Sequence, residues 1–164
     1  MFNKLAIKYV PWKNFIEKTI NEGLREVKRL DSKNDSQKVT NFIKQRKSLL
    51  KIDNIVLLHK DLQPQNILWN GNKITGFFDF ESAIFGDTHY DFNFLEGKLF
   101  KAFPDSRNIF YKTYQRNGGV LRENYEEIVR TYELVKLLYY IVHAQKYGEM
   151  DRVLENIKKL NDLI

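Results

Sequence analysis

The 164-residue sequence predicts a mostly helical α+β fold with a small β element in the middle of the chain. Apolar residues recur at helical spacing in the first fifty residues and again from Tyr90 to the C-terminus. Between residues 55 and 80 the pattern changes to short β-branched runs. The length suits one domain and no repeat or linker divides it, so we expect residues 1–164 to form a single domain.

Two helices are expected before the β element. The first runs from Pro11 to Leu30 and carries an apolar stripe that includes Trp12. A polar break follows, and Ser36 is expected to cap a second helix that continues to about residue 50. After the β element, helices are expected from Tyr90 to near Pro104, from about Ser106 to Gly118-Gly119, from Tyr125 to Tyr147 and from Val153 to Leu163.

Three short apolar runs form the β element: Ile55–Leu58, Ile67–Trp69 and Ile74–Phe80. They are rich in β-branched and aromatic residues, which strands favour. Asn70-Gly71 joins the second run to the third, and this pair favours the positive φ angles of a tight hairpin turn. We therefore expect these two strands to form a hairpin.

The net charge of +6 is unevenly distributed along the chain. Residues 1–54 contain 13 Lys/Arg against 6 Asp/Glu, whereas residues 55–100 contain 3 against 6. The basic surplus is spread along helical patterns, which favours a solvated face over a nucleic-acid interface. The acidic middle segment suits a site that holds cations.

The composition also excludes several kinds of site. There is no cysteine, which rules out disulfides, thiolate metal sites and cysteine nucleophiles. The first residues lack a signal-peptide pattern because lysines soon interrupt them. The longest apolar run, Leu134 to Ala144, contains Lys136 and His143 and is too short to cross a bilayer. We expect a soluble, cytoplasmic protein with no membrane partner.

The polar residues around the β element are of the kinds that phosphoryl transfer requires. The reaction needs a carboxylate that orients the attacking hydroxyl, and oxygen ligands that hold Mg²⁺ against the phosphates. Asp61 suits the first role. Asn66 and Asp79 suit the second, because Mg²⁺ takes one or two protein carboxylates and keeps water and phosphate for the rest. The predicted hairpin would bring Asp79 back beside Asn66.

The order of these residues resembles a known catalytic loop. His59-x-Asp61, then Asn66, a hydrophobic strand and Asp79 followed by phenylalanine, form the protein-kinase pattern. Further details are more similar to the small-molecule branch, which comprises aminoglycoside phosphotransferases and choline-kinase-like enzymes. These details are the D-L-x-P-x-N loop in Asp61–Asn66, the strand Ile74–Glu81 and the run Gly86–Asp91.

This resemblance implies the C-terminal lobe of a protein-kinase-like fold, whose β-hairpin carries the catalytic segment. It implies ATP, or another nucleoside triphosphate, as co-substrate and Mg²⁺ as cofactor. Asp61 would be the catalytic base, and Asn66 and Asp79 the magnesium and nucleotide ligands. The expected function is transfer of the γ-phosphate to the hydroxyl of a small substrate.

The sequence departs from the family pattern in two ways. Lys60 replaces a usual glycine, and Thr88 a usual proline. No glycine-rich phosphate loop occurs, and Lys8, with Glu22 as its helix partner, resembles the nucleotide-binding lysine only superficially. We therefore expect the N-terminal β lobe to be absent, the chain alone to be weakly active or inactive, and the exposed surface to bind a missing lobe or self-associate.

Other polar residues have less specific roles. His59 and Asp91 are expected to support the catalytic loop by hydrogen bonding, while Lys60 and Glu81 are candidates for contact with substrate or phosphate. Asp87 is interpreted as structural. Aromatic and charged residues nearer the C-terminus are interpreted as packing or solvated surface, with a cationic-substrate site as the alternative: Tyr132, Tyr139, Tyr140, His143, Tyr147, Asp151 and Glu155.

Three functions thus remain distinguishable from the sequence. The first is a small-molecule O-phosphotransferase or its catalytic lobe, and the second is a non-catalytic kinase-like module that binds a ligand or protein. The third is a basic nucleic-acid-binding domain, which has only the charge of residues 1–54 in its favour. The intact set of Asp61, Asn66 and Asp79 favours the first, and nothing in the sequence identifies the substrate.

Overall fold

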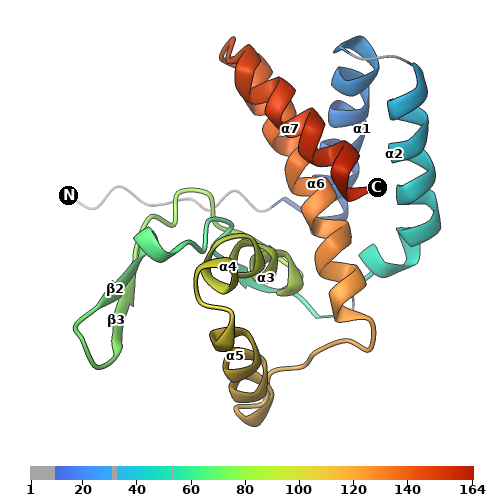
Figure 1. Ribbon diagram of the computed structural model, residues 1–164. Coiled ribbons are helices and arrows are strands. Elements are labelled where there is room, and N and C mark those ends of the chain that lie inside the picture. The colour runs from blue at the N-terminus through green and yellow to red at the C-terminus, as the bar shows by residue number, and fades with distance from the viewer. Residues whose placement is uncertain (1–9, 31–32, 53) are drawn as a thin grey trace. The chain divides into compact units, whose positions relative to one another are not determined.

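A computed structural model describes residues 10–30, 33–52 and 54–164 (Figure 1). Lys8, the candidate nucleotide lysine, lies outside the described residues. The chain divides into two compact units. One is built mainly from Asn54–Val129, and the other from Pro11–Asp53 and Arg130–Ile164. That residues 1–164 form a single domain stays a prediction.

The second unit is helical and contains α1 (Trp12–Leu30), α2 (Lys33–Arg46), most of α6 (Tyr125–Lys146) and α7 (Met150–Leu163). A 3-10 helix, Lys47–Leu50, extends α2. These helices confirm the predicted ones, except that α2 begins at Lys33, so the prediction that Ser36 caps it is wrong. All four helices contribute to one core: Val27, Val39, Phe42, Leu134, Leu137, Leu138, Ile141, Ala144, Val153 and Leu160.

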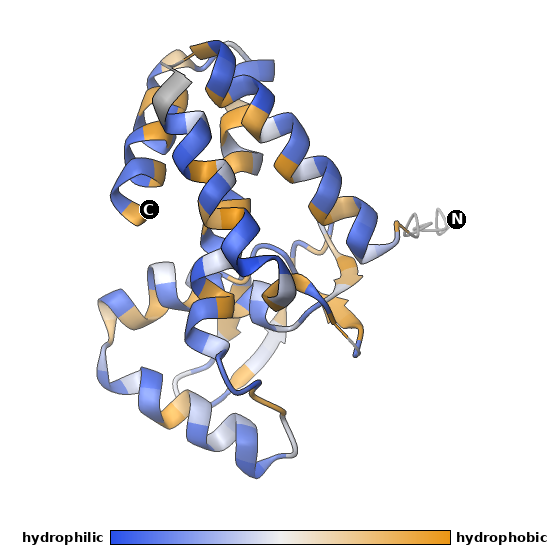
Figure 2. Cartoon of the chain, turned by 90° about the vertical axis from the view of Figure 1, so that its right-hand side faces the viewer, coloured by the Kyte–Doolittle hydropathy of each residue, from blue (hydrophilic) through white to orange (hydrophobic). Residues whose placement is uncertain are grey.

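The helices of this unit are amphipathic, and Figure 2 shows hydrophobic residues alternating with hydrophilic ones along them. This pattern lets each helix bury one stripe and leave the opposite face in water. Among the described helices, none combines the length and the apolarity needed to span a bilayer.

The first unit contains two small antiparallel sheets. β1 (Val56–Leu58) pairs with β4 (Ile84–Gly86), and β2 (Ile67–Trp69) forms a hairpin with β3 (Ile74–Phe77). The hairpin confirms the prediction, but β4 was not expected from the sequence. β3 ends at Phe77 instead of Phe80, because Asp79 has a φ of 67°, which extended backbone cannot adopt.

The hairpin turn differs in detail from the one predicted. Of the two turn residues, only Gly71 has a positive φ, 95°. The Asn70 side chain takes over part of the turn, since its Oδ1 accepts hydrogen bonds from the backbone N–H groups of Asn72 and Lys73, both at 3.1 Å. The connection is therefore wider than a turn made by Asn70 and Gly71 alone.

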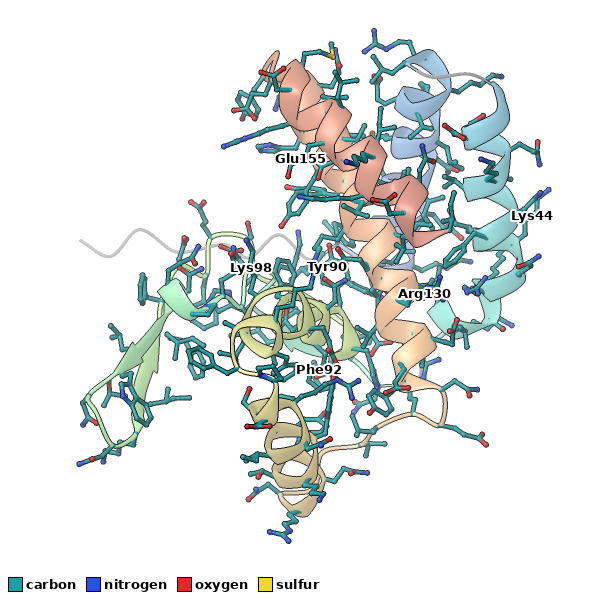
Figure 3. The ribbon with its side chains drawn as sticks, in the orientation of Figure 1. Lys44, Tyr90, Phe92, Lys98, Arg130 and Glu155 are labelled. Carbon is teal, nitrogen blue, oxygen red and sulfur yellow. The ribbon has the colours of Figure 1, made fainter. Side chains whose placement is uncertain are left out.

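The helices of the first unit form a continuous run after β4. This run contains α3 (His89–Phe94), a π-helix (Leu95–Leu99) and α4 (Phe100–Ala102), and α5 (Asp105–Arg116) follows. Phe92 projects from α3 toward α5, where its ring contacts Tyr111 and Tyr114 edge-on (Figure 3). Leu62, next to Asp61, packs against the same core, which comprises Phe92, Leu95, Phe100, Tyr111 and Val129.

Candidate active site

The loop from His59 to Asn66 is held by a carboxylate from α3. Asp91 accepts the backbone N–H of His59 through Oδ2 at 2.8 Å and that of Lys60 through Oδ1 at 2.9 Å. Burial raises the pKa of Asp91, although these two backbone donors and the positive charge of Lys60 oppose the shift. One side chain thus fixes two successive peptide groups directly before Asp61.

Lys60 is in an unusual backbone conformation. Its φ is 64°, in the left-handed region that costs a residue with a Cβ about 1–2 kcal/mol. Burial lowers the pKa of its ammonium group, while the attraction of Asp91 opposes this. The backbone conformation gives a physical reason for the glycine that is usual at this position in the enzymes that the sequence resembles.

The Asp61 carboxylate lies between two amide side chains. Asn66 donates from Nδ2 to Oδ2 of Asp61 at 2.9 Å and to the Asp61 backbone carbonyl at 2.9 Å. Gln63 donates from Nε2 to Oδ1 of Asp61. Asn66 is only 5% exposed, whereas Asp61 and Gln63 are half-buried. Each carboxylate oxygen therefore has its own donor and keeps lone pairs for a further contact.

The β2–β3 hairpin returns the chain to this loop. Ile67 pairs with Phe77, and the Phe78 N–H donates to the Asn66 carbonyl at 3.2 Å, so Asp79 follows directly after the residue opposite Asn66. The Asp79 side chain is exposed. Its positive φ is the second left-handed conformation of a non-glycine residue in the described chain, and strain of this kind concentrates at functional sites.

His59 connects the loop to the segment around Asp79. Its Nε2 donates to the Phe78 carbonyl at 2.9 Å, and the centroid of its ring lies 4.4 Å from the ring centroid of Phe80. Its Nδ1 accepts the Asp61 N–H at 3.3 Å, so these contacts select the neutral tautomer with the proton on Nε2. His59 thus contacts both neighbours of Asp79 and keeps the two halves of the site together.

A second cluster fixes the start of α3, which carries Asp91. Asp87 Oδ1 accepts hydrogen bonds from the His89 N–H at 3.0 Å and from His89 Nδ1 at 2.6 Å. Arg122 donates to the other Asp87 oxygen at 2.9 Å. Asp87 and His89 are almost fully buried. Sequence reasoning assigned no role to His89, Arg122 or Gln63. Arg122 is 35 residues from Asp87 in the sequence, whereas Gln63 and His89 lie two residues from their partners, a spacing that does not by itself indicate a contact.

Asn66 and Asp79 could hold a magnesium ion. Because Asn66 donates through Nδ2, its Oδ1 remains for a metal, and Asp79 adds one exposed carboxylate. Within the described residues, no three His, Cys, Asp or Glu side chains gather as a metal cage. One neutral and one charged oxygen ligand nevertheless suit Mg²⁺, which keeps several waters and binds substrate phosphates.

The remaining residues singled out from the sequence take no part in the hydrogen bonds given above. Glu81 follows the hairpin and is exposed. In the second unit, Tyr139 and His143 stack on α6 with ring centroids 6.0 Å apart, and the His143 ring is tilted against that of Tyr147, directly after α6, at 4.8 Å. On α7, the Lys159 ammonium group donates a hydrogen bond to the Glu155 carboxylate. These contacts are compatible with the packing and surface roles expected from the sequence.

Comparison with solved structures gives the fold. The chain matches the GDP complex of wild-type aminoglycoside 2'-phosphotransferase-IIIa with a TM-score of 0.73 and 20% identity, over 94% of this chain and 52% of that one. The GDP complex of a mutant of that enzyme gives a TM-score of 0.75 and 19% identity, over 96% and 52%. A ternary complex of aminoglycoside phosphotransferase APH(4)-Ia with AMP-PNP and hygromycin B gives 0.65 and 17%, over 95% and 52%.

At these identities the matches show a shared kinase-like fold, and the chain spans about half the length of each solved structure. No curated protein sequence matches the chain. The sequence model of the phosphotransferase enzyme family (APH) matches residues 16–128, well over half of the chain and including the whole His59–Asp91 segment. The chain therefore belongs to the phosphotransferase enzyme family.

Proposed function

We propose that the chain is the catalytic lobe of an ATP- and Mg²⁺-dependent phosphotransferase that acts on a hydroxyl of a small molecule. The observation that carries this proposal is the Asp61 carboxylate, held between Gln63 and Asn66 with Asp79 beside the loop. Membership of the phosphotransferase family supports it. So do the nucleotides GDP and AMP-PNP and hygromycin B, which are the ligands of the similar structures.

In this proposal Asp61 orients the substrate hydroxyl and receives its proton. Both carboxylate oxygens are fixed by amide donors, so the base needs little reorganisation when the hydroxyl arrives. Asn66 Oδ1 and Asp79 would hold Mg²⁺, which supplies positive charge against the phosphate oxygens when bound. His59 and Asp91 keep these groups in place, and Lys60 and Glu81 remain candidates for contact with phosphate or substrate.

We also propose that the strands of the first unit are covered by another body in the active molecule. Both faces of the β2–β3 hairpin expose large apolar side chains, including Leu68 at 52% and Trp69 at 62%. A two-stranded hairpin whose two apolar faces are both exposed to solvent is only marginally stable by itself. The partner would be an N-terminal β lobe, as the half-length coverage of the solved structures suggests, or a second copy of the chain.

Replacing the base tests this function. With an N-terminal lobe of a relative supplied, Asp61→Asn should reduce phosphate transfer by about 10² or more, since general-base catalysis contributes on that scale. Nucleotide affinity should stay within about twofold, because the side chain is isosteric. A substrate-panel assay and calorimetry measure the two quantities, with Asp105→Asn on the exposed face of α5 as the control. Equal loss of affinity and turnover would assign Asp61 a structural role.

A further inference from the structure

The two oxygens of the Asp61 carboxylate have different surroundings. Oδ2 faces Asn66, whose side chain is buried and donates to two atoms of Asp61. Oδ1 faces Gln63, which is half-buried and comes from the same loop. Under the proposed function, Asn66 is a metal ligand, so Oδ2 lies on the metal side. This leaves Oδ1 as the oxygen that meets the substrate hydroxyl.

Gln63 is well placed to act on that oxygen because its backbone is fixed at both ends. Its N–H donates to the Asp61 carbonyl at 2.8 Å, and its own carbonyl accepts the Asn66 N–H at 2.9 Å. Pro64 begins the short 3-10 helix that follows, and Gln63 itself has extended dihedrals of −115° and 156°. The backbone of Gln63 is therefore held in place, and its side-chain amide donates to Asp61 Oδ1 from this fixed position.

We infer that Gln63 is the positioning residue that sets the plane of the Asp61 carboxylate and directs the free lone pair of Oδ1 toward the substrate hydroxyl. This role rests on the proposed function. With Asn66 as sole donor, the carboxylate could pivot about a single hydrogen bond, whereas two donors on different oxygens fix its rotation. Because Oδ1 has two acceptor positions, the Gln63 amide occupies one and leaves the other for the hydroxyl.

Removing the amide donor should impair the reaction without impairing nucleotide binding. Gln63→Met keeps the length of the side chain and lacks any donor, and Gln63→Glu keeps its shape but replaces the donor with a second carboxylate beside Asp61. Both should reduce kcat by about 10- to 100-fold, since small misplacements of a catalytic group cost up to about that much. The KM for nucleotide should change by less than about twofold. Gln65→Met makes the same change two residues away, at an exposed position, and should leave kcat unchanged.

A spectroscopic measurement on the 164-residue chain tests the contact independently of turnover. The side-chain amide of Gln63 can be assigned in ¹H–¹⁵N spectra by its loss in Gln63→Met. Its resonances should move toward those of free amides in Asp61→Ala, which leaves no acceptor for the amide, and stay in place in Gln65→Met. An unmoved amide in Asp61→Ala, or a kcat in Gln63→Met equal to that in Gln65→Met, would overturn the inference.

The same measurements separate this inference from the proposed function. If the amide responds to Asp61→Ala but the parent chain with a supplied lobe neither binds Mg-ATP nor transfers phosphate, the proposed function fails and the positioning role fails with it. If the parent transfers phosphate and Gln63→Met does so equally well, the proposed function stands and only the role of Gln63 is overturned.

Discussion

At the scale of single residues, the site depends on backbone conformations that are unfavourable in isolation. Lys60 and Asp79 both have φ values in the left-handed region, at 64° and 67°. The carboxylate of Asp91 accepts the N–H of Lys60 and of His59, and His59 in turn bonds the carbonyl next to Asp79. A few hydrogen bonds thus hold the strained residues on both sides of the Asp61 loop.

The conformation of Lys60 leads to a prediction about stability. Lys60→Gly should raise the free energy of unfolding above that of Lys60→Ala by about 1 kcal/mol, because only glycine adopts this φ without strain. The two variants both delete the long side chain, so their difference reports the backbone. Urea unfolding of the pair measures it. An alanine variant as stable as the glycine variant would show that the loop is relaxed in solution.

At the scale of secondary-structure elements, the packing within each unit determines where the helices and strands lie. In the second unit, α1 approaches α6 at Gly23, where an added Cβ would lie 2.5 Å from the Cβ of Leu138. In the first unit, α5 is fixed to the π-helix by Arg107, whose Nε donates to Glu96 at 2.8 Å. Tyr111 donates to the same carboxylate at 2.9 Å.

Substitution of Gly23 tests the close approach of α1 and α6. Gly23→Ala should lower the free energy of unfolding by about 1–2 kcal/mol, since overpacking costs about 1–3 kcal/mol and the gain in helix propensity offsets only part of it. Asn21→Ala, at an exposed position of the same helix, should be neutral or stabilising. Thermal unfolding compares the two. A stabilised Gly23→Ala variant would contradict the close packing.

The sequence predicted the elements with a clear period and missed those fixed by long-range contacts. The stripe of α1 and the Asn70-Gly71 turn are local signals, and both elements were found. β4 has only three residues and pairs with β1, more than twenty residues earlier, so no local pattern indicates it. In the site, Asp61, Asn66 and Asp79 follow a recognisable spacing, whereas the Asp87–His89–Arg122 cluster depends on a partner 35 residues away.

At the scale of the whole molecule, the exposed apolar surface of the strands is the feature that most needs a partner. The side chains concerned are large and close together in the sequence: Val56, Leu57, Leu68, Trp69, Ile74, Phe77, Phe78, Phe80 and Phe85. Large apolar side chains that gather on an exposed surface mark interaction sites or cause association. This chain spans about half the length of the similar structures, and the N-terminal lobe proposed above would be one such partner.

The isolated chain should therefore self-associate through these strands. Light scattering after size exclusion should show dimers or larger species, and Trp69→Lys together with Leu68→Lys should shift them toward monomer. Ile109→Lys introduces the same charge at a residue of α5 that is 66% exposed, and should leave the distribution unchanged. A chain that stays monomeric at high concentration, or one that Ile109→Lys disperses equally well, would argue against an interface on the strands.

In the proposed function, this chain holds a magnesium–nucleotide complex between Asn66 and Asp79. Titration of the 164-residue chain with ATP, with and without Mg²⁺, can be followed in ¹H–¹⁵N spectra, which detect weak binding. Mg²⁺-dependent shifts should concentrate in residues 59–66 and 78–81 and disappear in Asp79→Ala, because this change removes the charged member of the two proposed ligands. They should persist in Asp105→Ala. Shifts of equal size in Asp79→Ala, or shifts confined to the second unit, would contradict the proposed active site.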